Sequence, residues 1–219
     1  MSRPDRTRPD AAGRGAGVPR QASPRSADRT RQTILDAAET LLRRHGAGKT
    51  GVVDVARACG MSHANVYRFF TSKAALFDAV AEGWLVRDAA PLYAVARGRA
   101  RPAARLVRWI VAVYRHKRRK MIDEPEVFAF YKALAAESNR DLFAQHTKDL
   151  AAQLRHILAD GVAAGDFAVG DADRAVGTIL DATASLRHPA IVADPKALDE
   201  KRVKAVALMI RAALVAGVL

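Results

Sequence analysis

Residues 50–73, with the sequence TGVVDVARACGMSHANVYRFFTSK, contain the pattern that decides the fold. The pattern predicts two short helices joined by a tight turn, over residues 52–59 and about 63–70. Gly60 is expected to end the first helix, because a residue without a Cβ atom adopts the left-handed conformation at little cost. Apolar contacts of the first helix are expected from Val52, Val53, Val55, Ala56 and Ala58.

Each of the two helices begins next to a residue that suits the N-cap position. Thr50 is expected to cap the first helix and Ser62 the second, because a hydroxyl oxygen accepts from the free backbone N–H groups of the first turn. Within the second helix Val66, Phe69 and Phe70 recur at helical spacing, so we expect them to point inward.

The outward side of the second helix carries side chains that add nothing to a core: His63, Ala64, Asn65, Tyr67 and Arg68. In protein–DNA complexes an amide pairs with adenine, a guanidinium pairs with guanine or phosphate, a methyl group contacts the thymine methyl, and a phenol contacts phosphate. A helix with this combination suits the major groove of DNA. Residues of about 50–69 are therefore predicted to form a helix-turn-helix, with the second helix as the reader.

The residues before this stretch extend the pattern, because an amphipathic helix is expected over about 30–45. Its segment ILDAAETLLRRHG (34–46), together with TGVVDVARACGMSHANVYRFFTSKAALFDAV (50–80), resembles the tetracycline-repressor (TetR/AcrR) family of bacterial transcription regulators. The resemblance covers about residues 28–87. It implies an all-α fold with an N-terminal three-helix DNA-binding domain and a larger C-terminal helical domain for ligand binding and dimerisation.

Composition and resemblance together divide the chain into three parts. Residues 1–27 are rich in Arg, Pro, Gly, Ser and Ala and poor in large apolar groups, which predicts a disordered basic tail. The tail is either simply solvated or an arm that contacts phosphates or the minor groove. Residues 28–88 are expected to form the DNA-binding domain, and residues 89–219 the helical domain for effector binding and dimerisation.

A fourth helix is expected over about 72–87, leading from the DNA-binding domain into the second domain. Lys73 lies in its first turn, against the dipole preference for an acidic residue, which fits a phosphate bound at this helix start. The family resemblance implies the same role for Lys73. The expected DNA-contact residues are Thr50, Ser62, His63, Ala64, Asn65, Tyr67, Arg68 and Lys73.

The second domain is predicted to be helical throughout. Between residues 89 and 102, Pro91, Gly98 and Pro102 are expected to break helical continuity. Further helices are predicted over about 102–120, 125–138, 139–164, 170–187 and 198–218. Aromatic residues of these helices either line a ligand pocket or form plain core, and the pocket candidates are Trp84, Trp109, Tyr114, Phe128 and Tyr131.

The chain carries a strong excess of positive charge, with 36 Lys or Arg against 23 Asp or Glu, a net charge of +13 and a pI of about 10.5. Such an excess favours a polyanionic partner, with solubility or an Arg-rich genome as the alternative explanation. Residues 115–120, RHKRRK, form a cationic run at a predicted helix end. The helix dipole and solvation account for this run, and a phosphate contact or an anionic effector are the alternatives.

The last two long predicted helices are rich in apolar residues on more than one face. They either pack inside the monomer or are buried against a partner. In the family that the chain resembles, this pair forms the dimer contact as a four-helix bundle across a two-fold axis. The resemblance therefore implies a homodimer through about residues 171–187 and 198–218.

Several classes of site are not expected. The sequence has no Gly-rich phosphate loop, HExxH, CxxC or nucleophile elbow, so neither an enzyme with catalytic residues nor a cofactor is predicted. No metal site is expected, since the spacing of His146 and His156 turns them apart on a helix and Asp171 and Asp173 suit helix capping.

The single cysteine, Cys59, is interpreted as a small core residue, with redox sensing as the alternative. With no apolar run of about 20 residues and no secretory signal, a cytoplasmic, nucleoid-associated protein is expected.

The sequence therefore predicts a sequence-specific DNA-binding regulator. The leading hypothesis is a homodimeric repressor that binds a palindromic operator and is released from it by a small molecule. The alternatives are a sequence-independent basic DNA-coating protein and a transcriptional activator. The effector, the operator sequence and the regulated genes do not follow from the residues.

Overall fold

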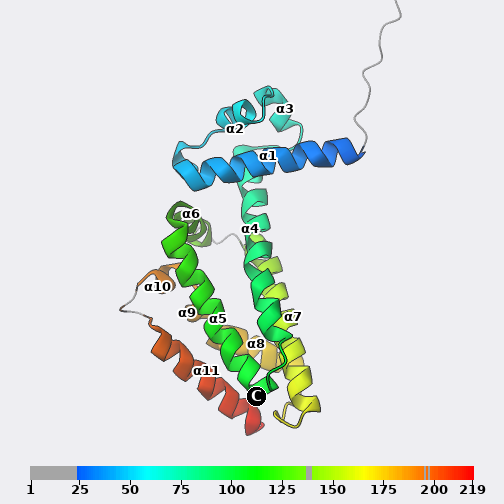
Figure 1. The fold of residues 1–219 in the computed structure, drawn as a ribbon, viewed down its shortest axis with the longest axis vertical. Coiled ribbons are helices and arrows are strands. Elements are labelled where there is room, and N and C mark those ends of the chain that lie inside the picture. Colours follow the sequence, from blue (N-terminus) through cyan, green and yellow to red (C-terminus); the bar gives the residue numbers. More distant parts are fainter. Residues whose placement is uncertain (1–23, 137–139, 195, 197) are drawn as a thin grey trace, which may run out of the picture.

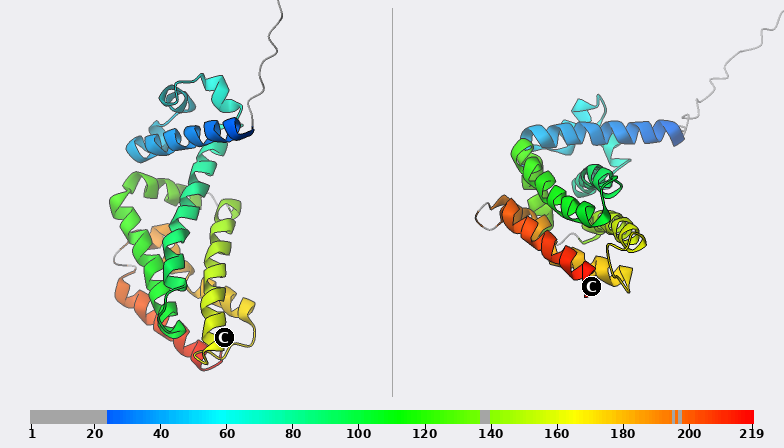
Figure 2. Two further views of the ribbon diagram at one scale, coloured as in Figure 1. Left: turned by 45° about the vertical axis from the view of Figure 1, so that its right-hand side comes forward. Right: turned by 60° about the horizontal axis from the view of Figure 1, so that its bottom comes forward.

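The computed structural model describes residues 24–136, 140–194, 196 and 198–219, and all regular structure in them is helical. A small head of three helices lies at one end of the long helix α4, and the remaining helices pack along the rest of α4, with α6 next to the head (Figure 1). The C-terminus lies at the end of the molecule away from the head (Figure 2). The all-α, two-part architecture predicted from the sequence is confirmed.

The head consists of α1 (Pro24–His45), α2 (Val52–Ala58) and α3 (His63–Tyr67), with a short 3-10 turn, η1 (Ala47–Lys49), between the first two. Helix α1 begins before Thr30, where the sequence had placed its start, so the last part of the expected basic tail is helical. The rest of that tail, residues 1–23, lies outside the described residues.

Helix α4 (Lys73–Ala96) is continuous over 24 residues, so the predicted end near residue 87 and the predicted interruption at Pro91 are wrong. Proline removes one backbone N–H and leaves the carbonyl four residues earlier without its usual partner. Pro91 and Arg87 both have exposed side chains, which places that carbonyl on the side of the helix that water can reach. One helix therefore runs from the head deep into the second domain.

The second domain packs α4 against α7 and α5 against α11. Its helices are α5 (Pro102–Asp123), α6 (Pro125–Ala136), α7 (Arg140–Ala163), α8 (Ala172–Ala182), α9 (Ala184–Arg187), α10 (Pro189–Ala193) and α11 (Glu200–Val215). Asp171 caps α8 as expected, with its carboxylate accepting from the Arg174 N–H at 3.0 Å. The single helix predicted over 170–187 is wrong, because the buried Thr183 separates α8 from α9.

Two apolar clusters form the core of the described residues. The first joins α5, α7, α8 and α11 to the end of α4. The second contains the buried residues of α1, α2, α3 and the start of α4, and also four residues of α6: Val127, Phe130, Tyr131 and Leu134. The head therefore shares its core with α6, and the boundary expected near residue 88 falls inside a continuous helix.

No helix in the described ranges combines the length and apolar character that crossing a membrane requires. Among the same residues, no three His, Cys, Asp or Glu side chains are grouped so that they could hold a metal ion.

Cys59 is half-buried against α1, where its thiol lies 3.7 Å from the Thr33 carbonyl oxygen, and burial raises the thiol's pKa. A raised pKa disfavours the reactive thiolate, which supports the interpretation of Cys59 as a packing residue.

Candidate functional site

The turn between α2 and α3 forms as the sequence predicts. Gly60 has φ of 66°, the left-handed conformation in which a side chain would be strained. Ser62 caps α3, with its hydroxyl oxygen accepting from the Asn65 N–H at 3.3 Å. This turn fixes the angle at which α3 leaves α2.

The expected role of Thr50 as the cap of α2 is wrong. Thr50 is only 2% exposed, and its hydroxyl donates to the Gly46 carbonyl at 2.8 Å. The N-cap of α2 is Gly51, whose N–H donates to the Asp54 carboxylate at 3.0 Å. Thr50 thus lies inside the head in this conformation, and its hydroxyl is not presented for the DNA contact that the sequence suggested.

Helix α2 buries one side only. Val52, Val55 and Ala56 are buried, whereas Val53 is 55% exposed and Ala58 is also exposed. The expected apolar contacts from Val53 and Ala58 are therefore wrong. A helix of two turns that packs on one side cannot bury adjacent residues alike, so Val53 next to Val52, and Ala58 after Ala56, point outward.

Helix α3 is shorter than expected, because it ends at Tyr67 with Arg68 as its C-cap. Val66 and Phe70 are buried and Phe69 is half-buried, so the inward side is as predicted. The opposite side is open to solvent at four of the five expected positions: His63, Ala64, Tyr67 and Arg68. The remaining one, Asn65, is half-buried, with its amide nitrogen 3.8 Å from the sulfur of Met61.

Three contacts hold exposed side chains of this surface in place. The rings of His63 and Tyr67 meet edge to face, with centroids 5.3 Å apart. At the start of α4, which Ser72 caps, the Lys73 ammonium donates to the Ala47 carbonyl at 3.3 Å and lies 5.0 Å from the centre of the Phe77 ring. Lys73 thus lies where the sequence expected it, exposed in the first turn of a capped helix.

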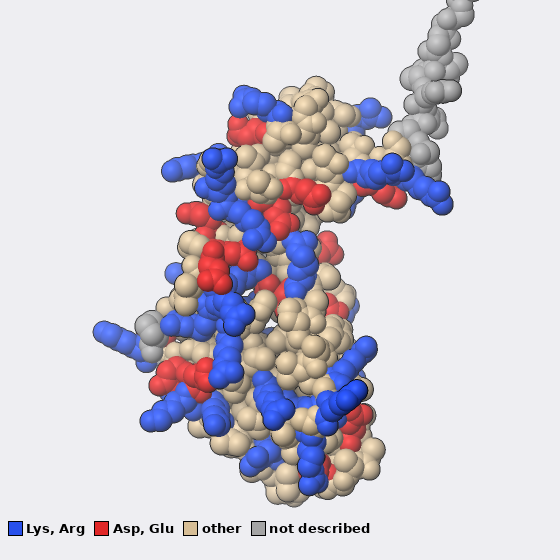
Figure 3. Space-filling model, viewed as in Figure 1, with Lys and Arg blue, Asp and Glu red and all other residues tan. Residues whose placement is uncertain are grey.

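The positive charge of the chain is not confined to the head. On the face shown in Figure 3, Lys and Arg side chains are distributed over the head and over the second domain alike. Net charge alone therefore does not locate a nucleic-acid surface. The exposed side of α3, with its mixture of amide, imidazole, phenol and guanidinium groups, is the more specific feature.

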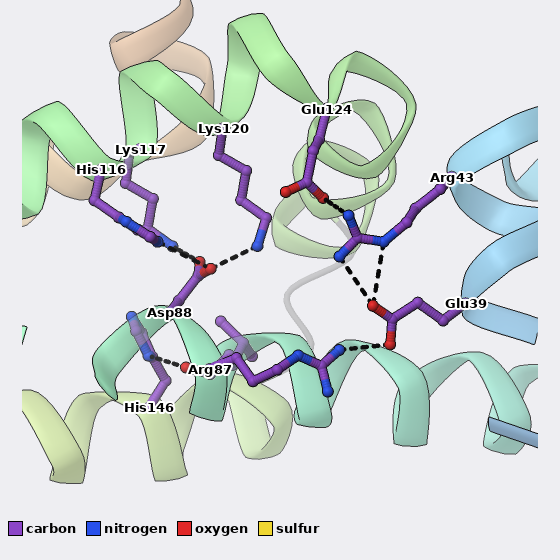
Figure 4. Close-up of polar contacts among 10 residues, drawn as sticks. Glu39, Arg43, Arg87, Asp88, His116, Lys117, Lys120, Glu124 and His146 are labelled. Atoms are coloured by element: carbon purple, nitrogen blue, oxygen red, sulfur yellow. Dashed lines mark hydrogen bonds and ion pairs between the residues drawn. The ribbon is translucent and has the colours of Figure 1, made fainter. Parts of the chain in front are cut away.

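Two ion pairs join the head to the second domain, and a third within α1 links them (Figure 4). Glu39 on α1 lies 2.9 Å from Arg43 on the same helix and 2.5 Å from Arg87 on α4. Arg43 also lies 2.6 Å from Glu124, between α5 and α6. The position of α1 is thus tied to α4 and to the junction of α5 and α6.

Asp88, the residue after Arg87 on α4, is the centre of a second cluster (Figure 4). Its carboxylate lies 2.5 Å from the Lys120 ammonium, 2.9 Å from the Lys117 ammonium and 3.2 Å from the ring of His116. Burial raises the pKa of Asp88, but the His116 hydrogen bond and the charges of both lysines outweigh it and hold the pKa well below its ordinary value. Within the cationic run 115–120, solvation accounts for the exposed Arg115 and Arg119 but not for Lys117 and Lys120, which are buried.

A cavity of about 340 Å³ lies beside this cluster, within the size range of small-molecule sites. Phe128 and Tyr131 line it, whereas the other three pocket candidates do not. Trp84 and Trp109 are packed in the two core clusters, and the Tyr114 hydroxyl donates to the Leu198 carbonyl. The cavity is lined by Leu85, Lys117, Lys120, Phe128, Tyr131, Ala135, Phe143, His146, Thr147, Ala184, Arg187, His188 and Pro189.

Four residues that line the cavity were not predicted from the sequence: Lys117, Lys120, Arg187 and His146. For the two lysines a signal was present. They continue at helical spacing the stripe that includes Val113, so the buried side of α5 runs into the cationic segment. For Arg187 and His146, which reach the cavity from α9 and α7, no local pattern indicated the position.

His146 makes the free energy of unfolding depend on pH. Burial and the charge of Lys117 lower its pKa from 6.5 to about 3, so the ring is neutral and its Nδ1 donates to the Leu85 carbonyl at 3.2 Å. Between pH 6.5 and 3 the unfolded chain therefore binds a proton at this position that the folded chain does not. We expect the free energy of unfolding to fall on acidification, with His146 accounting for about 2 kcal/mol between pH 7 and pH 5.

Urea unfolding at a series of pH values measures this effect. In His146→Gln the loss between pH 7 and pH 5 should be smaller by about that amount. The matched control is His156→Gln, on the same helix but exposed. An unchanged pH slope in His146→Gln would contradict a neutral, buried ring.

Two family models match the chain. One is described as "Bacterial regulatory proteins, tetR family" and matches residues 34–80, and the other as "Tetracyclin repressor-like, C-terminal domain" and matches residues 102–207. Among curated proteins no match was found.

Three similar solved structures illustrate the likeness in fold. A TetR/AcrR-family transcriptional regulator from Thermobifida fusca is 22% identical, with a TM-score of 0.56 over 84% of this chain and 97% of that one. FadR from Bacillus subtilis, in complex with stearoyl-CoA, is 17% identical, with a TM-score of 0.56 over 85% and 98%. SmeT, the repressor of the Stenotrophomonas maltophilia efflux pump SmeDEF, is 20% identical, with a TM-score of 0.57 over 84% and 89%.

Proposed function

The chain belongs to the tetracycline-repressor (TetR) family of bacterial transcription regulators, and from that premise we propose that it is a homodimeric repressor released from a palindromic operator by a small molecule. It is a DNA-binding regulator and not an enzyme. The observation that carries the proposal is the exposed side of α3, whose side chains add nothing to the core. Helix α3 lies next to the start of α4, and α4 runs from the head into the second domain, which contains the cavity.

The proposed contacts separate into two classes. His63, Ala64 and Asn65 lie toward the N-terminus of α3, the part of a reading helix that meets base edges. Phosphate contacts are assigned to Tyr67, Arg68 and Lys73, and to the hydroxyl hydrogen of Ser62, whose oxygen is already used as the cap. Thr50 is left out of this set because it is buried.

A dimer is supported by the second apolar side of α11. Val203, Ala207, Ile210 and Leu214 of this helix are buried in the monomer. On its other side Ala205, Leu208, Met209, Ala212 and Val215 recur at helical spacing and are exposed, with Met209 at 64%. An uncovered apolar stripe of this kind is typical of an interface. This stripe lies within residues 198–218, one of the two segments expected to form the dimer. The other expected segment, residues 171–187, contains α8.

Release by an effector is supported by the connection between cavity and head. Asp88, which binds two cavity lysines, neighbours Arg87, which binds α1 through Glu39. A ligand changes DNA affinity only if it binds the DNA-bound and DNA-free shapes unequally. FadR was crystallised with stearoyl-CoA, which supports a ligand for the corresponding domain here.

Selection of bound sites from random duplex DNA tests the proposal. A repressor of this type should return one palindrome, with an affinity at least about a thousandfold above that for unrelated DNA. Selection without enrichment would instead indicate a basic DNA-coating protein. Transcription from a promoter that carries the selected site then distinguishes repression from activation.

Replacing Asn65 and Lys73 should separate the two classes of contact. Asn65→Ala is expected to lower affinity for the selected site by about 1–3 kcal/mol and to relax base preference at one position. Lys73→Gln is expected to weaken binding to all sequences alike and to reduce the slope of log affinity against log salt by about 1.

Fluorescence anisotropy at several salt concentrations measures both effects. Lys49→Gln, an exposed lysine in the η1 turn, is the matched control for charge. Uniform weakening by Asn65→Ala, or altered base preference in Lys73→Gln, would mean that α3 meets DNA in a different orientation.

A further inference from the structure

Every charged side chain that lines the cavity is a cation. Lys117, Lys120 and Arg187 reach it from two helices, and neither Asp nor Glu is among the lining residues. The rest of the wall is mostly apolar or aromatic, with Leu85 and Phe128 among its members. The cavity therefore combines an apolar body with a cationic side.

The two lysines of this wall are short of counter-charge. Within the described part of the chain, Lys117 and Lys120 share one carboxylate, that of Asp88. Both ammonium groups also lie 5.2 Å from the centre of the Tyr131 ring, where the π face supplies weak compensation. Burial lowers the pKa of Lys117, which reflects the cost of keeping this ammonium away from water.

Two further polar groups of the wall are incompletely hydrogen-bonded. Arg187 donates from one terminal nitrogen to the Leu180 carbonyl at 2.7 Å, but its buried Nε has no hydrogen-bond partner among the described residues. The buried hydroxyl of Tyr131 has no hydrogen bond of good geometry, although Asp88 lies close enough to add to the effect of burial in raising its pKa. Buried polar groups are normally satisfied, so this side of the cavity is incompletely paired by the described residues.

We propose that the effector is an organic carboxylate with an apolar body. On binding, its carboxylate displaces that of Asp88 as the ionic partner of Lys117 and Lys120. The regulatory part rests on the proposed function. Asp88 holds α4 against α5 through these two cations and through His116, so a ligand carboxylate that pairs with both lysines weakens that hold. The neighbouring Arg87 ties the same turn of α4 to Glu39 of α1.

Binding to the full-length protein without DNA tests the ligand class. Titration calorimetry would compare 4-phenylbutyrate and octanoate with 4-phenylbutanamide and octanamide, which keep the apolar body and lose the charge. At least one carboxylate should bind about tenfold or more tightly than its amide, because a charge-assisted contact to a buried cation is lost in the amide. Equal binding of each carboxylate and its amide, or no binding of any of the four, overturns the proposal.

Variants locate the effect. Lys117→Gln and Lys120→Gln should each remove most of the preference for carboxylate over amide, whereas Lys132→Gln, an exposed lysine on α6, should leave it unchanged. Asp88→Asn, which removes the internal competitor, should bind the carboxylates more tightly than the wild-type protein. Weaker carboxylate binding by folded Asp88→Asn contradicts displacement.

If Asp88→Asn is too unstable for calorimetry, its melting temperature is measured in sodium acetate and in sodium chloride of equal ionic strength. Acetate should raise the melting temperature of Asp88→Asn more than that of Asp88→Asn/Lys120→Gln, and equal responses overturn the proposal. Since none of these measurements contains DNA, failure here leaves the operator selection standing. Failure of the selection likewise leaves a carboxylate site intact.

Discussion

A chain that carries both Leu208→Glu and Met209→Glu is expected to be a monomer and to lose about a thousandfold or more of its affinity for the selected operator. Both side chains lie on the exposed apolar stripe of α11, which in the proposed dimer is covered by a second copy. Two buried, unpaired carboxylates per subunit oppose that contact. A single α3 then contacts only one half-site, and most of the base contacts that distinguish the operator from other DNA are lost.

Sedimentation equilibrium and mobility-shift titration, at one salt concentration, measure the two effects together. The control is Ile122→Glu/Val162→Glu, which adds the same charge at exposed apolar positions on α5 and α7. If the α11 variant remains dimeric, the interface lies elsewhere. A monomer with undiminished operator affinity would show that one α3 suffices for recognition.

Trp84→Ala is expected to lower the free energy of unfolding by about 3–5 kcal/mol. Trp84 is completely buried, and its ring meets Phe130 edge to face with centroids 5.8 Å apart and lies 5.9 Å from Tyr131. These two partners belong to α6, so the truncation opens a cavity where the head, α4 and α6 meet.

Urea denaturation followed by circular dichroism measures this loss. Val86→Ala, at an exposed position two residues further along α4, should change the free energy of unfolding by no more than about 0.5 kcal/mol. A loss below about 1 kcal/mol for Trp84→Ala would mean that neighbouring side chains fill the space.

Local signals in the sequence were sufficient for the head. A glycine in the turn, a serine cap and apolar residues at helical spacing identified α2 and α3, and Ser62 and Gly60 act as predicted. Residue type alone was not sufficient where tertiary packing opposes the local preference. Thr50 suits a cap by residue type, but its hydroxyl donates to Gly46 instead. Pro91 suits a helix break, but one solvent-facing carbonyl costs little against the packing of α4 on α7.

The cavity could be predicted only in part. Aromatic content pointed correctly to the helices around Phe128 and Tyr131, yet the same criterion selected Trp84 and Trp109, which fill the core. Whether an aromatic ring faces a void or other side chains depends on packing between helices distant in sequence. The same limit applies to Lys117 and Lys120, since their burial depends on Asp88 from another helix.

The contribution of α6 to the core of the head bears on how new DNA specificities could be engineered into this scaffold. A graft of residues 28–88 onto a relative would leave behind Val127, Phe130 and Tyr131, which form one wall of that core. The DNA-binding head is thus not an independent folding unit that can be transferred without α6. Exchanging only the solvent-facing side chains of α3 would leave every shared wall in place, and this makes it the less disruptive route to a protein with altered targets.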